Sequence, residues 1–160
     1  MKKSILYILL VSLAFISCKT KTEEILETNQ SVVQDYAQIF SKVEADSLSK
    51  KIIDFELFST NEICVYTIDS IPNNESALYY ATKIANNLGV GKKEKDNGLL
   101  ILISKYDRQI GIATGYRTEN IFTDYMCKTI IENTIVPQFK NGNYYEGINN
   151  ALDSIMTKWK

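Results

Sequence analysis

The chemistry open to this sequence is limited first by one missing residue type, because its 160 residues include no histidine. A Ser-His-Asp or Cys-His nucleophile system needs an imidazole base, and an HExxH zinc site or a His-Glu deaminase centre needs imidazole as well. Any catalysis by this chain would therefore depend on carboxylates, hydroxyls, amides, amines, guanidinium groups, phenols or thiols.

Oxygen-bearing side chains occur in two short segments that could form one site. Asp96 and Asn97 lie in the first, and Glu119 ends the second, with Asp124 five residues later. Ca²⁺ prefers such oxygen ligands, whereas zinc and copper usually take His or Cys. If the segments meet, they predict a hard-cation site of these four residues, with Asp124 binding directly or through water. The alternative is structural, because Asp-Asn-Gly is a common turn and acids stabilise helix starts without a ligand.

A β-hairpin is predicted to bring the two segments together. The apolar run 99–104 is typical of a strand buried on both faces, and 108–113 predicts a second strand. The tight turn between them, which contains Asp107, makes the strands antiparallel. We expect Ser104 to pair with Gln109.

This register places the oxygen-rich segments at the same end of the hairpin. Gly98 then lies opposite Gly115, so that Asp96 and Asn97 lie beside residues 114–119. Glycines at these positions let backbone segments approach closely. The turn residue Asp107 falls at the other end and is not expected in the site.

The remaining elements are predicted from caps and periodicity. They are a helix over 42–58 after a Ser-x-x-Glu capping box, a strand over 62–68, a helix from an Asn74 cap to Leu88 with Gly89 as its stop, and helices over 119–133 and 144–158. The helical crossover between strands 62–68 and 99–104 favours parallel, right-handed pairing. The predicted fold class is α/β, a three-layer α/β/α sandwich with a small mixed sheet.

Two cysteines lie within this folded part. Cys64 sits in an apolar run and Cys127 in a predicted helix, so both are expected to be small buried hydrophobic residues. A disulfide between them is the alternative, since the expected compartment permits one. A catalytic thiol is not expected, because no histidine can act as its base.

The amino-terminal region is predicted to direct export. A positively charged start precedes the apolar stretch 5–16, which is too short to cross a bilayer and is typical of a signal peptide over 1–17. The sequence Ala-Phe-Ile-Ser-Cys, ending at Cys18, resembles a bacterial lipoprotein box. This resemblance implies cleavage before Cys18 and a lipid on its sulfur. The alternative is an ordinary signal peptide with an incidental cysteine.

A polar tether is predicted to separate the lipid from the folded domain. Residues 19–34 are charged and polar with little apolar periodicity. We divide the chain into the signal peptide, lipidated Cys18 with its tether over 18–31, and a folded domain over 32–160. The chain carries 18 basic and 19 acidic residues, a net charge of −1, and offers no basic field for nucleic acid. The predicted location is the cell envelope, on the periplasmic or the outer-surface side.

The folded part resembles the TPM domain family over about residues 32–158. Its members include thylakoid-lumen proteins linked to photosystem II repair and many bacterial envelope proteins. The resemblance is carried by Val33-x-Asp35-x-Ala37, by Asp96-Asn97-Gly98 before the apolar strand, by Asp107-Arg108, by Thr114-Gly115-Tyr116 with Glu119, by Ile121 to Asp124, and by Ile135-x-Pro137-x-Phe139. Arg117 stands where the family usually has glycine.

The resemblance implies a three-layer sandwich and divalent-metal binding, chiefly calcium, with Asp35 as a further ligand. One interpretation is a lipid-anchored calcium-binding module that supports protein quality control or complex assembly with an envelope protein partner. The alternative is a divalent-metal-dependent acid phosphatase, since some plant members are described as acid phosphatases. In that alternative Asp96 or Glu119 is the general base and Arg117 clamps the ester.

Overall fold

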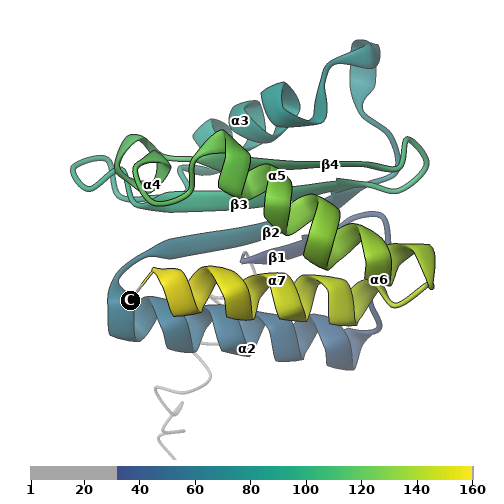
Figure 1. The fold of residues 1–160 in the computed structure, drawn as a ribbon, viewed down its shortest axis with the longest axis horizontal. Helices are drawn as coiled ribbons and strands as arrows, with labels where there is room; N and C mark the ends of the chain where they lie inside the picture. Colours follow the sequence, from purple (N-terminus) through teal and green to yellow (C-terminus); the bar gives the residue numbers. More distant parts are fainter. Residues whose placement is uncertain (1–31, 160) are drawn as a thin grey trace, which may run out of the picture.

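The computed structural model describes residues 32–159 and is built on a four-stranded mixed sheet (Figure 1). Its strands, in spatial order, are β1 (Val33–Asp35), β2 (Glu62–Ile68), β3 (Gly98–Ser104) and β4 (Gln109–Thr114). The first three strands are parallel and β4 is antiparallel to β3. The predicted mixed sheet, with its parallel and antiparallel pairings, is confirmed.

The predicted hairpin register is also confirmed. Ser104 pairs with Gln109, and the amide of Gly115 donates to the carbonyl of Gly98 over 2.9 Å. We call the end of the sheet formed by residues 95–98 and 114–119 the loop end. The opposite end, where residues 104–109 connect β3 to β4, is the turn end.

Helices cover both faces of the sheet and make three layers (Figure 1). One face packs against α3 (Ala77–Leu88), and the other against α2 (Lys42–Ser59), α5 (Asp124–Ile130) and α7 (Tyr144–Lys158). Every residue of β3 is buried, because Leu99, Ile101 and Ile103 face the larger core while Leu100 and Leu102 face the smaller one. The β3 sequence therefore lacks alternating polar residues because both faces of the strand are buried.

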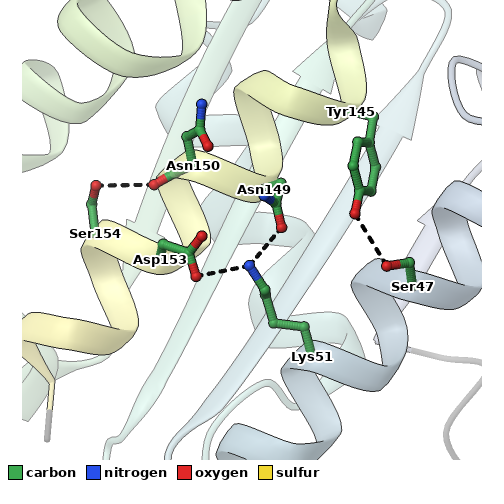
Figure 2. Close-up of polar contacts among 7 residues, drawn as sticks. All are labelled: Ser47, Lys51, Tyr145, Asn149, Asn150, Asp153 and Ser154. Carbon is green, nitrogen blue, oxygen red and sulfur yellow. Dashed lines mark hydrogen bonds and ion pairs between the residues drawn. The ribbon is translucent and has the colours of Figure 1, made fainter.

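Polar side chains join α2 to α7 at the rim of the larger core (Figure 2). The ammonium of Lys51 donates to Asn149 Oδ1 over 2.5 Å and to Asp153 Oδ1 over 2.7 Å. The hydroxyls of Ser47 and Tyr145 lie 3.1 Å apart. Two residues of α2 and three of α7 make these contacts, which fix how α2 lies against α7.

Local sequence signals set several boundaries as predicted. Ser41 and Glu44 form the capping box of α2, and Gly89 ends α3 in the left-handed conformation. The predicted cap of α3 is wrong, since Ser76 accepts a hydrogen bond from Tyr79 while Asn74 ends the short 3₁₀ turn Pro72–Asn74. Pro72 starts that extra turn before the helix begins.

Two further predictions need correction. No strand was predicted at β1, because Val33 and Gln34 end the polar stretch 19–34 and gain their strand hydrogen bonds only by pairing with β2. Residues 19–31, the predicted signal peptide and Cys18 lie outside the described residues. The single helix predicted over 119–133 is instead α4 (Tyr116–Glu119), a turn, α5, and the π-helical turn Ile131–Ile135 leading into α6 (Val136–Lys140). Within residues 32–159, no helix is long and apolar enough to cross a membrane.

Candidate functional site

The two oxygen-rich segments meet at the loop end, as the hairpin register predicts. The hydroxyl of Thr118 donates to the carbonyl of Asp96 over 3.2 Å. A Cβ atom on Gly115 would lie 2.5 Å from that same carbonyl oxygen, so only glycine permits the approach. The structure therefore places Asp96 and Asn97 directly beside the start of α4.

Asn97 has a structural role at this end. Its side chain is 7% exposed, accepts a hydrogen bond from the amide of Lys92 over 3.0 Å, and donates to the carbonyl of Thr60 over 2.6 Å. These two bonds tie the loop after α3 to the end of α2. Both polar atoms of the amide are thus engaged within the fold, which leaves Asn97 poorly placed as a metal ligand.

Three predicted ligands keep available oxygens, two at the loop end and the third, Asp124, in the first turn of α5. Asp96, Glu119 and Asp124 are exposed, and no hydrogen bond among residues 32–159 engages their carboxylates. In the same part of the chain, no three acidic, histidine or cysteine side chains lie close enough together to hold a metal ion. The donor chemistry suits Ca²⁺, but the carboxylates do not form a preassembled cluster.

Asp35 lies away from these residues. It pairs with Thr67, five residues along β2 from the loop end, or roughly 17 Å at about 3.3 Å per residue. Its carboxylate accepts hydrogen bonds from the Thr67 hydroxyl over 2.5 Å and from the amides of Ile39 and Phe40 over 3.1 and 2.9 Å. Asp35 therefore fixes the β1–α2 connection, and the structure does not bring it to the other predicted ligands.

Asp107 has the predicted role of a turn residue. It accepts hydrogen bonds from the Ser104 hydroxyl and the Ile71 amide, both over 2.6 Å. These bonds lower the pKa of Asp107, the Ser104 bond most strongly. The carboxylate thus anchors the turn end to the segment that follows β2.

Sequence reasoning did not single out a second pair of acids near the loop end. Glu62 opens β2 and accepts a hydrogen bond from the amide of Gly91 over 2.8 Å. Burial, and then the negative charge of Glu62, raise the pKa of Glu56. The sequence could have placed Glu62 at this end, because parallel pairing of the two strands sets Glu62 opposite Gly98.

The described cysteines are buried and lie on different faces of the sheet. Cys64 belongs to the smaller core and Cys127 to the larger one, and no disulfide joins them. Burial raises the pKa of Cys64 to about 12. Burial, with the nearby charge of Asp124, raises the pKa of Cys127 to about 11. Both thiols remain protonated at neutral pH, which suits the predicted packing role and not nucleophilic chemistry.

We therefore expect very slow thiol modification of the native protein. At pH 8 a thiol with a pKa of about 11 is only about 0.1% thiolate, whereas an unperturbed thiol with a pKa of about 8.5 is roughly one quarter ionised. In a chain lacking Cys18, a disulfide reagent should react at least about 100-fold more slowly before denaturation than after it. Cys127 should react before Cys64. Comparable native and denatured rates would contradict the buried assignment.

The fold and the loop end together define a class of protein, a three-layer α/β/α domain whose mixed sheet carries the exposed carboxylates of Asp96 and Glu119 at one end. The sequence matches the TPM domain family over residues 33–158. The chain belongs to the TPM domain family, as its motifs indicated. A comparison with curated protein sequences gives no match.

Solved structures of similar shape support this assignment. The N-terminal domain of a protein from P. gingivalis is 26% identical with a TM-score of 0.74, over 83% of this chain and 84% of that one. BA42 from Bizionia argentinensis is 22% identical with a TM-score of 0.64, over 75% and 81% of the two chains. The N-terminal domain of cg2496 from Corynebacterium glutamicum is 18% identical with a TM-score of 0.63, over 82% and 81%. The latter two show the shared fold alone.

Proposed function

We propose that this protein is a lipid-anchored binding module of the bacterial cell envelope that supports protein quality control or complex assembly. The observation that carries the proposal is the separation of the predicted acidic groups, with Asp96 and Glu119 exposed at the loop end and Asp35 engaged at the other. The two buried thiols, with their raised pKa values, are likewise suited to packing. Asp35 and the two thiols thus serve loop connection and packing, and the exposed Asp96 and Glu119 are left for surface binding.

We further propose that Ca²⁺ binds at the loop end, where Asp96, Glu119 and Asp124 would hold it. The Thr118–Asp96 hydrogen bond supports this, because it fixes the two segments side by side. Bound calcium would supply positive charge between carboxylates that come from separate loops. Such a site, with few preassembled ligands, is expected to bind in the range of extracellular modules, about 10⁻⁴–10⁻³ M.

A calcium titration followed by amide NMR shifts tests this site. We expect saturable shifts centred on residues 96–98 and 115–124 in residues 18–160 carrying Cys18→Ala, with magnesium competing weakly. Asp96→Asn should abolish these shifts, because asparagine lacks the charge but tolerates the positive φ of 47° at this position. Asp46→Asn, which changes an exposed acid on α2, serves as the matched control. If no saturable shift appears at millimolar calcium, calcium binding is refuted. The proposal of a lipid-anchored module would then stand without it.

Lipid attachment at Cys18 is tested separately. We expect a fatty-acid label and membrane association for the full-length chain in a bacterial host, and loss of both in Cys18→Ala. Cys127→Ala should keep both, because that thiol is buried in the domain. If the Cys18→Ala variant retained the fatty-acid label, lipid attachment at Cys18 would be refuted.

The phosphatase alternative has one supporting observation. Arg117 is exposed two residues from Glu119, and no hydrogen bond or ion pair within residues 32–159 engages its guanidinium. If the alternative holds, hydrolysis of p-nitrophenyl phosphate at low pH should require a divalent cation. The activity should be lost in Asp96→Asn and in Arg117→Gln while the fold persists. Activity that survives both changes would come from another source.

A further inference from the structure

A pocket of about 420 Å³ lies at the turn end, on the face of the sheet that carries the larger core. Its walls come from the connection before α2, the β3–β4 hairpin, α6 and the start of α7. The apolar part of its lining consists of Ile39, Ile103, Ile110, Val136, Phe139 and Tyr144. This volume falls within the range of small-molecule sites, about 300–1,000 Å³.

Positive charge surrounds this apolar pocket. Lys105, Arg108 and Lys140 line it, and none of the described lining residues carries a carboxylate. Lys105 donates to the carbonyl of Ala37 over 2.9 Å. Within residues 32–159, no hydrogen bond or ion pair engages the charged groups of Arg108 and Lys140. Two cations are thus available to a ligand at the mouth of an apolar cavity.

The nearest acid of the hairpin does not neutralise these cations by pairing with them. Asp107 is bound instead to the Ser104 hydroxyl and the Ile71 amide. Arg108 follows it in the left-handed region with a φ of 53°, a conformation that glycine or asparagine adopts at lower cost. The one acid of the hairpin is therefore engaged by Ser104 and Ile71, while its arginine lines the pocket without such a partner among residues 32–159.

The start of α7 forms one wall of the pocket. Tyr144 is the first residue of this 15-residue helix and lines the pocket. Asn143 precedes it and makes no side-chain hydrogen bond to the helix amides. The first amides of a helix carry partial positive charge, but the exposed Glu146 adds a negative charge in the same turn. Arg108 and Lys140 are therefore the groups that favour an anion.

We propose that the pocket binds an organic anion whose apolar aryl or alkyl body carries a terminal carboxylate. The apolar body lies against Phe139 and the isoleucines, and the carboxylate reaches Arg108 and Lys140. A guanidinium group suits a carboxylate because it can donate two parallel hydrogen bonds. The carboxylate can belong to a free acid or to the C-terminus of a polypeptide that ends in a large apolar residue. This site is separate from the loop end and does not depend on calcium binding there.

Titration calorimetry on the full-length protein in phosphatidylcholine nanodiscs tests the proposal, with empty nanodiscs as the blank. The free-acid probe is 4-phenylbutyrate, and the peptide probe is acetyl-Ala-Ala-Phe with a free C-terminus. At least one should bind with a Kd of about 1 mM or tighter. The corresponding amide, 4-phenylbutanamide or the peptide amide, should bind at least about tenfold more weakly, because a charge-assisted hydrogen bond is lost.

Charge variants locate the binding. Arg108→Asn removes the cation with a residue that tolerates positive φ, and Lys140→Gln changes an exposed position, so both variants should fold. Each should weaken binding about tenfold, whereas Lys93→Gln, the same loss of charge at an exposed lysine in the loop after α3, should leave it unchanged.

The two probes distinguish the sources. Binding of 4-phenylbutyrate indicates a free acid, and binding of the peptide alone indicates a polypeptide C-terminus. The proposal is overturned if neither probe binds, if the amides bind equally well, or if Lys93→Gln weakens binding as much as Arg108→Asn.

Discussion

Replacing Phe122 with alanine is expected to lower the free energy of unfolding by about 3–5 kcal/mol. The ring is 1% exposed, and its centroid lies 5.4 Å from that of Trp159 in an edge-on arrangement. Trp159 in turn packs against Phe55 of α2, so the three rings join α2, the α4–α5 connection and the end of the chain. Removal of the Phe122 ring would leave a cavity among elements that cannot easily close it. Urea denaturation of the two proteins measures the difference.

Tyr125→Ala is the matched control for this prediction. Tyr125 lies three residues away in the first turn of α5, but it is 79% exposed, so its truncation should change stability by less than about 0.5 kcal/mol. Phe122 lies between Glu119 and Asp124, and its loss should also broaden the amide signals of the loop end. Equal small effects from both variants would show that the ring does not anchor this part of the fold.

Local and hairpin-scale features of this fold were predictable because short-range chemistry determines them. The Ser41 capping box and the Gly89 stop depend on residues within one turn of each helix end. The register of β3 and β4 follows from a tight turn, since a one-residue slip would reverse the faces of Ile103 and Ile110. These features could be derived from spacing before any tertiary contact was known.

The errors occur where distant contacts decide the local structure. β1 has only three residues, and its backbone becomes a strand because it pairs with β2, which comes some thirty residues later. The predicted helix over 119–133 is interrupted because Phe122 enters the core and Thr123 then caps α5. Neither the pairing of β1 with β2 nor the burial of Phe122 can be recognised from the residue pattern within the segment concerned.

In the candidate site, too, the features set by local sequence were predicted and those set by distant contacts were not. Hairpin geometry correctly placed Asp96 beside Thr118. It did not reveal that the side chain of Asn97 turns inward, since Thr60 belongs to the end of α2 and is remote in sequence. The pocket at the turn end was also missed, because residues from four separate segments form it. Asp35 was misplaced for a different reason, namely that a motif resemblance carries no information about which end of a sheet a residue occupies.

Asn97→Ala is the second large effect, with an expected loss of about 2–3 kcal/mol in the free energy of unfolding without calcium. The change removes the acceptor of the Lys92 amide and the donor to the Thr60 carbonyl. Both backbone groups lie in partly buried surroundings, so they would lose bonds that water only partly replaces. The loop after α3 would then separate from the end of α2. Denaturant titrations in chelator, with a change in midpoint and an unchanged slope, measure this loss.

The Asp96→Asn variant distinguishes the structural role of Asn97 from the proposed ligand role of its neighbour Asp96. Asp96 is exposed and tolerates asparagine at its positive φ, so this variant should keep the stability of the parent protein in chelator to within about 0.5 kcal/mol. Calcium should stabilise the parent by RT ln(1 + [Ca²⁺]/Kd) and should not stabilise Asp96→Asn. Asn97→Ala should keep a calcium increment despite its lower baseline, because its amide is engaged within the fold. If Asn97→Ala instead lost only the calcium increment and kept its stability in chelator, Asn97 would be a ligand and the structural assignment would be wrong.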